Sequence, residues 1–195
     1  MIKVRTVLFS IALGLSCWQF GQGGYLHAKA VLAQQLIEDA WLQTLENLQH
    51  NKPWSWADTW PVGRLQVPAH DIDLYVLAGD SGSTLAFGPG HHIGSARPGE
   101  LGTSLISAHR DTHFSFLKKL VAGDEILFQG TDGHWQHYQV SNSAVVHESS
   151  AISDTNVNNM LALVTCYPFD AIMPGGPLRF VVFAERKRPL LYKSA

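Results

Sequence analysis

The sequence predicts a mainly β domain, a single barrel or sandwich, that follows an apolar N-terminal segment and a helix. From Ile72 onward, short apolar or alternating runs recur, and Gly, Pro and Asp turn signals separate them. Before that point the chain holds one uncharged stretch and one stretch with apolar residues at helical spacing. Its 195 residues are enough for one domain of ordinary size and an accessory segment.

Composition narrows the class of protein. Hydrophobic residues make up 46% of the chain and charged residues 15%, which fits a globular protein with a membrane segment rather than a disordered one. The formal net charge of -2 leaves no broad basic surface, so we expect no nucleic-acid partner.

The N-terminal segment is predicted to be a membrane anchor. Lys3 and Arg5 precede an uncharged, mostly apolar stretch from Thr6 to Tyr25, which is about the length of one bilayer crossing. A signal peptide could look similar, but no pair of small residues in an A-x-A cleavage pattern is evident near its end. Because the basic residues come first, the N-terminus should stay cytoplasmic and the rest should cross. Residues 1–25 are therefore the predicted cytoplasmic tip and anchor.

Residues 26–66 are predicted to form a membrane-proximal helix and a linker rich in Trp and Pro. The helix should run from about Lys29 to Gln49, where one apolar stripe recurs at steps of three and four: Ala33, Ile37, Trp41, Leu45 and Leu48. Prolines from Pro53 onward should end it and enforce extended backbone. We interpret Trp54, Trp56 and Trp60 as a plug on the domain core.

Residues 67–195 should form the β domain. The expected strands cover residues 72–76, 103–109, 124–129, 145–146, 161–166 and 178–183, with a hairpin around Asp132-Gly133. A short helix or turn is expected at 113–121 and a polar turn at 156–160.

Three of these strands carry chemically useful residues at their ends or within them. The apolar run from Leu161 ends at Cys166, the run from Thr103 ends at His109, and Arg179 lies in an otherwise apolar strand. A buried cysteine is often only structural. A cysteine accompanied by a histidine and an arginine, however, supplies a nucleophile, an acid/base and a fixed cation, as a thiol acyl-transfer site requires. Cys17 lies in the anchor and could not easily reach Cys166, so the latter should be a free thiol.

Arg179 is the least obvious of the three. It alternates with Val181 and Phe183, so its face of the strand is not evidently the solvated one. A charge on such a face needs a partner, and a substrate carbonyl that becomes an oxyanion could supply one.

The chain also resembles a known family. Ala162-Leu-Val-Thr-Cys166 resembles the nucleophile motif Thr-Leu-x-Thr-Cys of sortases, membrane-anchored cysteine transpeptidases, and departs from it at Ala162. Ser107-Ala-His-Arg-Asp111 and the strand Leu178–Val182 match the family's histidine and arginine motifs in the family's order. The resemblance covers roughly Val67 to Arg188. Residues 52–61 further resemble sortases of marine and other proteobacteria, which would make the host Gram-negative.

The resemblance implies an eight-stranded sortase β-barrel with short helices. It implies that Cys166 attacks an LPxTG-like sorting motif near the C-terminus of a secreted protein, that His109 protonates the leaving amine, and that Arg179 stabilises the oxyanion. An amine acceptor would then resolve the acyl-enzyme, without a cofactor or metal. The predicted location is the inner membrane, single-pass, with the catalytic domain on the periplasmic side.

Several alternatives remain open. A membrane-tethered cysteine endopeptidase would use the same residues, and a caspase-like protease also places a histidine before a cysteine, but the Gln-Ala-Cys signature is missing here. A metal protein could use His91, His92, His109 and His113, although no compact ligand spacing recurs. A membrane-tethered binding module would keep the barrel without needing the thiol.

Overall fold

The computed structural model describes residues 2–150, 159–173 and 175–187. The chain divides into two compact units, residues 1–36 and residues 37–195. A single long helix, α1 (Ile2–Asn47), contributes its first part to one unit and its last turns to the other. The predicted anchor and membrane-proximal helix are therefore continuous in secondary structure, with no break between them.

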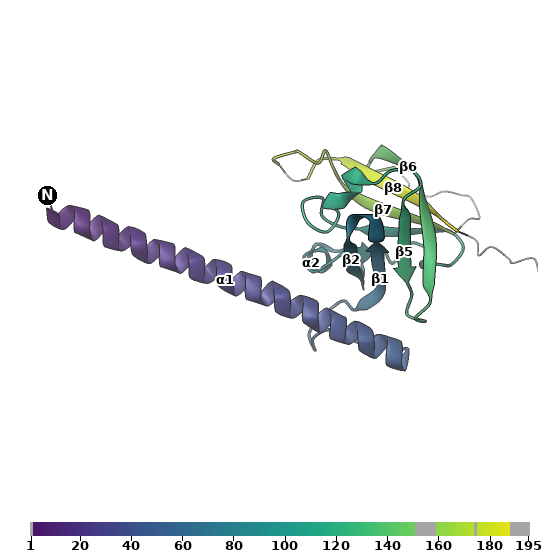
Figure 1. The fold of residues 1–195 in the computed structure, drawn as a ribbon, viewed down its shortest axis with the longest axis horizontal. Coiled ribbons are helices and arrows are strands. Elements are labelled where there is room, and N and C mark those ends of the chain that lie inside the picture. Colours follow the sequence, from purple (N-terminus) through teal and green to yellow (C-terminus); the bar gives the residue numbers. More distant parts are fainter. Residues whose placement is uncertain (1, 151–158, 174, 188–195) are drawn as a thin grey trace, which may run out of the picture. The chain divides into compact units, whose positions relative to one another are not determined.

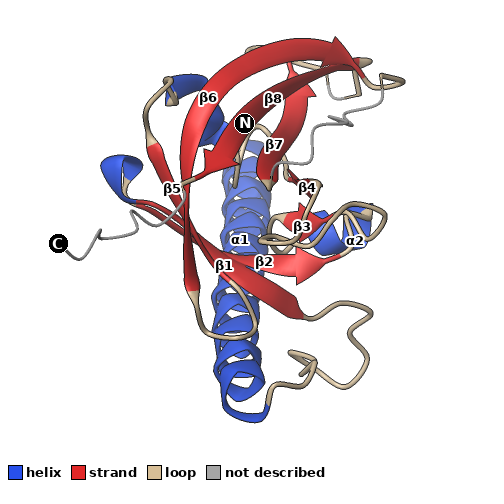
Figure 2. Ribbon diagram, turned by 90° about the vertical axis from the view of Figure 1, so that its right-hand side faces the viewer, coloured by secondary structure: helices blue, strands red, loops and turns tan. Residues whose placement is uncertain are grey.

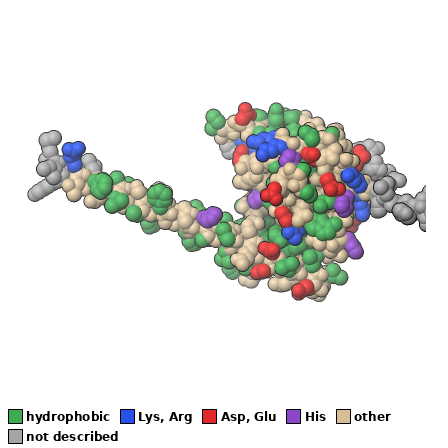
Figure 3. Space-filling model, in the orientation of Figure 1, with side chains coloured by type: hydrophobic (Ala, Val, Ile, Leu, Met, Phe, Trp, Pro, Cys, Tyr) green, Lys and Arg blue, Asp and Glu red, His purple; other side chains and the backbone are tan. Residues whose placement is uncertain are grey.

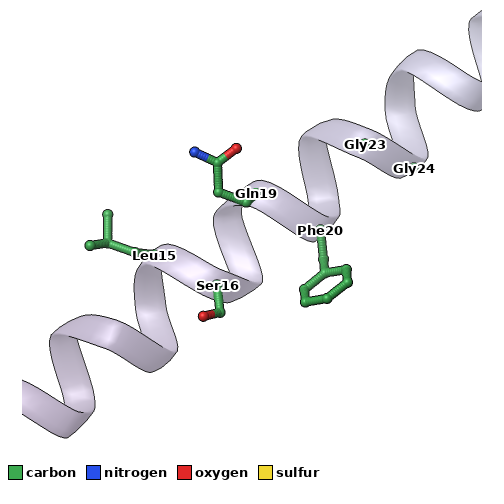
Figure 4. A pocket seen from close by; sticks show the side chains of 6 residues that line it. All are labelled: Leu15, Ser16, Gln19, Phe20, Gly23 and Gly24. Carbon is green, nitrogen blue, oxygen red and sulfur yellow. The ribbon is translucent and has the colours of Figure 1, made fainter.

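The first unit is helical and apolar. Among the described residues, one helix, Val4–Asn47, is long and apolar enough to cross a membrane by length and composition. No residue in its most apolar stretch is buried against the rest of the protein. A signal sequence meets the same criterion. Figure 3 shows mostly hydrophobic and uncharged side chains along the visible face of this segment. Figure 4 shows Leu15, Ser16, Gln19 and Phe20 standing out from the helix, beside the bare backbone of Gly23 and Gly24.

The second unit is an eight-stranded closed β-barrel, so the predicted fold class is confirmed (Figures 1 and 2). Around the barrel the strands follow the order β1-β2-β3-β4-β7-β8-β6-β5. Their bounds are β1 Pro61–Val67, β2 Ile72–Ala78, β3 Gly90–His91, β4 Thr103–Ser107, β5 Glu125–Gln129, β6 Trp135–His147, β7 Met160–Tyr167 and β8 Leu178–Arg186. The described connections hold three short helices: η1 Pro68–His70, α2 Gly82–Leu85 and η2 Ser115–Lys119.

Strand β7 is covered on both faces, which explains its nearly continuous apolar sequence. Leu161 and Leu163 belong to the main core inside the barrel, together with Val182 of β8. Ala162 and Val164 point the other way and form a smaller cluster on the outer face. Alternate residues of a strand face opposite sides of the sheet, so a strand buried on both faces has few polar positions.

Three features of the barrel differ from the sequence prediction. Residues 61–66, expected in the linker, belong to strand β1, because they pair with β2 and β5 and a proline is tolerated at the first position of a strand. Residues 135–147 form one long strand rather than two. A register shift between Val140 and Asn142 lets this strand stay paired with β8 across its polar central residues. Strand β3 lies between the expected strands 72–76 and 103–109, where the sequence predicts no strand. Residues 156–158 of the predicted polar turn lie outside the described residues, and Met160 begins β7.

The predicted apolar stripe on the helix is partly correct. In the second unit, Ile37 and Trp41 are each 1% exposed, as expected for a packing face, but Leu48 is 72% exposed. The tryptophan plug is also only partly correct, because Trp54 packs edge-on against Phe87 whereas Trp56 is 83% exposed.

Candidate active site

The histidine and cysteine strands lie side by side. Strands β4 and β7 pair in parallel, with Ser107 opposite Val164, and the Ala108 amide donates to the Val164 carbonyl at 3.1 Å. The buried Thr165 hydroxyl donates to the Ala108 carbonyl at 2.7 Å. These two bonds hold the backbone just before His109 against the backbone just before Cys166. The structure thus brings together two residues that are far apart in the sequence.

Arg179 lies on the other side of the cysteine. Strands β7 and β8 are antiparallel, and Cys166 and Arg179 are direct Cα partners. Residues directly opposite in an antiparallel pair place their side chains on the same face, with Cβ atoms about 4.5–5.5 Å apart. His109, Cys166 and Arg179 therefore come from three adjacent strands or strand ends, β4, β7 and β8.

All three residues belong to the outer face of the barrel. Ala108 lies in the main core, so the next residue, His109, turns outward and is exposed. Cys166 follows Val164 by two residues and Arg179 precedes Val181 by two, and both valines belong to the outer apolar cluster. Cys166 is a free thiol of intermediate exposure, so it is both supported and accessible. This is the combination that a nucleophile at a strand end requires.

The outer apolar cluster extends from the cysteine along the sheet. Its buried members are Ala162, Val164 and Val181, and partly buried Leu105, Val146 and Phe183 pack against them. Partly exposed apolar side chains beside a thiol are suited to hold an apolar stretch of peptide. Ala162, where the family motif has a threonine, is fully buried within this cluster.

The guanidinium of Arg179 is already held by the protein. Its Nη1 donates to the carbonyls of Gly176 at 2.6 Å and Leu178 at 3.0 Å, and its Nη2 donates to a carboxylate oxygen of Glu148 at 2.6 Å. An arginine has five N–H donors. Within the described part of the chain, these contacts leave the Nε–H and one Nη2–H of Arg179 without a partner. The group is therefore fixed in orientation and still has donors for an oxyanion.

A second histidine lies close to the first. Burial lowers the pKa of His113 below its ordinary value, and the nearby His109 lowers it further. The other two candidate metal ligands have different partners: His92 binds Asp80 at 3.0 Å, and His91 lies 2.9 Å from the Ala96 carbonyl. In residues 2–150, 159–173 and 175–187, His, Cys, Asp and Glu side chains form no group of three or more that could hold a metal ion.

The sequence predicts no role for two further polar residues at the site. The Thr165 hydroxyl links β7 to the histidine segment. Arg110, the neighbour of His109, is 6% exposed and donates to carbonyls beyond Cys166. The sequence feature that could have identified Thr165 and Arg110 is a polar residue beside a candidate catalytic residue. Whether such a residue is buried, however, depends on the tertiary structure.

A separate cavity of about 630 Å³ contains none of the three predicted site residues. It is lined by the start of β1, the end of β2 and the connection that follows β3, among others, including Trp60, Ala78 and Arg97. The three predicted site residues therefore lie at β4, β7 and β8 and do not line this cavity.

The fold and the arrangement of these strands define the class of sortase-type β-barrels, and comparison with known proteins agrees. The family model of the sortase domain matches residues 65–187. Sortase D of Bacillus subtilis (strain 168) is 29% identical over 126 residues, which are 64% of this chain and 63% of that protein. The match thus spans less than two thirds of that relative.

Solved structures show the same fold. Sortase A from Corynebacterium diphtheriae superposes with a TM-score of 0.60 at 26% identity, covering 75% of this chain and 68% of that one. The Sortase D5 transpeptidase of Clostridium perfringens superposes with a TM-score of 0.59 at 22% identity, covering 77% of this chain and 89% of that one. The chain belongs to the sortase family.

Proposed function

We propose that this protein cleaves an LPxTG-like sorting motif near the C-terminus of a secreted protein and transfers the cleaved protein to an amine. The observation that carries the proposal is the alignment of His109, Cys166 and Arg179 on one outward face, in a chain with the sortase fold. The Cys166 thiolate would attack the scissile carbonyl, and the C–N bond would break as His109 protonates the leaving amine. The acceptor amine would then attack the thioester, lose its proton to the now neutral His109 and release the thiolate.

The outer apolar cluster supports a peptide substrate with an apolar start. Leu105, Val146 and Phe183 are partly exposed beside Val164 and Val181, on the same face as Cys166. Leucine and proline side chains of a sorting motif could bury their apolar surface there while the scissile carbonyl reaches the thiol. The oxyanion formed during attack would lie near Arg179, whose charge is permanent.

The test is to trap the acyl-enzyme. The full-length chain in detergent would be incubated with a sorting peptide and no amine, and the mass of the peptide fragment attached to the protein would be measured. A thioester at Cys166 that disappears when an amine is added, with formation of the amide product, supports transpeptidation. Release of free acid even with excess amine would favour the cysteine endopeptidase instead, and no attached fragment with any sorting peptide would contradict both.

Arg179 should be required for acylation. Arg179→Lys keeps the charge but loses the planar fork of donors, and Arg179→Ala loses both, so we expect each to lower transfer by about 10²–10³-fold, the loss typical of removing one oxyanion donor. Cys166 should still react with a small alkylating agent, because alkylation builds no tetrahedral oxyanion. Arg186→Ala, a change of an exposed arginine on the same strand, is the matched control. Near-normal transfer by Arg179→Ala would leave the oxyanion to backbone amides.

We further propose that α1 anchors the protein in the inner membrane as a single pass, with the barrel on the periplasmic side. The long apolar helix and the early positive charges, Lys3 and Arg5, support this orientation. Removing residues 1–24 should release a soluble and still active domain. Protease added to cells without their outer membrane should digest the barrel, and permeabilised cells provide the control for cleavage. Complete protection in the intact cells would contradict the orientation.

A further inference from the structure

Arg110, the residue after His109, is a buried cation without a buried counter-charge among the described residues. Its side chain is 6% exposed, and its ion pair is with Asp111, which is 70% exposed and adjacent in sequence, at 3.3 Å. A permanent charge is costly to bury unless hydrogen bonds replace its hydration. The positions of those hydrogen bonds therefore indicate what the residue does.

The strongest hydrogen bonds of Arg110 reach the segment beyond Cys166. Nη1 donates to the Pro168 carbonyl and Nη2 to the Ala171 carbonyl, each at 2.6 Å, and Nη2 also lies 3.5 Å from the Met173 carbonyl. Pro168 lies two residues after Cys166, and Arg110 lies one residue after His109. One guanidinium thus ties the chain after the candidate acid to the chain after the candidate nucleophile.

Part of the segment that Arg110 holds is exposed to solvent. In the connection between β7 and β8, the side chains of Ile172 and Met173 are 99% and 80% exposed, so core packing does not fix that part. Phe169 packs edge-on against Phe180 with ring centres 5.3 Å apart, which anchors only the start of the connection. Arg110 supplies the contacts that follow, at Ala171 and Met173.

We propose that Arg110 is a positioning residue for the transfer reaction: it fixes the spacing of His109 and Cys166 by bridging the two backbone segments that follow them. The inference rests on the proposed function. Its physical basis is that His109 and Cys166 come from different strands, β4 and β7. Beyond the last backbone hydrogen bond between these strands, side-chain hydrogen bonds hold the two segments at a fixed distance. The Thr165 hydroxyl sets the spacing on one side of the pair, and Arg110 sets it on the other.

Two substitutions separate positioning from general stability. Arg110→Met removes every hydrogen-bond donor of the side chain and keeps an unbranched apolar side chain. Arg110→Lys keeps the charge, but an ammonium on a flexible stem cannot reproduce the planar fork that reaches two carbonyls. Arg64→Met is the matched control, because Arg64 makes short bonds at 2.6 and 2.7 Å to Asp73 on the barrel wall and lies on β1. All variants would carry Cys17→Ala, so that alkylation counts Cys166 alone.

The full-length variants would be assayed for transfer of a sorting peptide, with kcat expressed per titrated Cys166 thiol. We expect kcat to fall by about 10–100-fold in both Arg110 variants, since a misplacement of about 1 Å can cost that much, while KM changes little. Amide hydrogen exchange should become faster in residues 108–114 and 166–173 together. The Arg64 control should retain its kcat. If Arg110→Met does not fold, Arg110→Lys carries the test.

The alternatives give different results. If Arg110 only stabilises the fold, the variants will melt earlier or yield fewer titratable thiols, but kcat per thiol will equal that of the parent, and the proposal is overturned. Unchanged exchange in both segments would overturn it as well. A parent protein that forms no thioester would overturn the proposed function, whereas normal turnover in both Arg110 variants would overturn only the role given to Arg110.

Discussion

Cys166→Ala should abolish covalent capture of a sorting peptide and all transfer to an amine. The thiolate is the only group of the proposed site that forms a bond to the substrate, so its loss removes the intermediate rather than slowing one step. The barrel should remain folded, because Cys166 is small and only partly buried at the end of β7. The measurements are the mass of the trapped protein, the yield of amide product, and the thermal unfolding of the same sample.

Cys17→Ala is the control for this substitution. Cys17 is exposed on α1 and belongs to the first unit of the chain, so its loss should leave capture unchanged. Cys166→Ser is a stricter variant, since it keeps a similar shape with a weaker nucleophile. Transfer that persists in Cys166→Ala would refute the thiol mechanism and would favour a binding module or a different nucleophile.

His109→Ala should lower turnover by about 10²–10⁴-fold, the usual cost of losing a general acid. The loss should appear in kcat, with little change in stability, because the His109 side chain is exposed and Ala108, not His109, contributes to the core. Specific activity and unfolding temperature should be measured on one preparation. A structural histidine would show the reverse pattern, with reduced stability and retained specific activity.

His113 makes the test of His109 more specific. It lies near His109, and burial holds its pKa below the ordinary value, so it should be largely neutral at pH 7. A neutral, more buried imidazole is less suited to donate a proton to a leaving amine. His113→Asn should therefore keep most of the activity that His109→Ala loses. If His113→Asn loses the activity and His109→Ala keeps it, His113 is the general acid.

Strand register brings the residues of the candidate site together on the barrel. The parallel ladder of β4 and β7 aligns the histidine and cysteine segments, and the antiparallel ladder of β7 and β8 aligns Cys166 with Arg179. Each ladder is held by backbone hydrogen bonds, which do not depend on side-chain identity. Side chains are needed where the ladders end, and Thr165 and Arg110 act there.

The order of motifs in the sequence predicted much of this arrangement. A cysteine and a histidine each end a short apolar run, and an arginine interrupts a third, so the candidate site residues are predicted on three strands. The predicted apolar face of Arg179 is also present, since Val181 and Phe183 lie in the outer cluster. Local patterns are enough to predict these strands, because strand periodicity and the residue types at strand ends depend on neighbouring residues in the sequence.

The sequence by itself determined the β class, the apolar N-terminal helix and the three candidate site residues. Tertiary structure alone decided that residues 61–67 form a strand, that β6 continues through a polar stretch, and that Glu148 pairs with Arg179. It also decided that Arg110 is buried. Each of these depends on a partner far along the chain: β1 on β2 and β5, β6 on β8, and the Arg110 guanidinium on carbonyls beyond Cys166. Periodicity describes one segment at a time, whereas hydrogen bonds and burial are properties of pairs that only the folded barrel brings together.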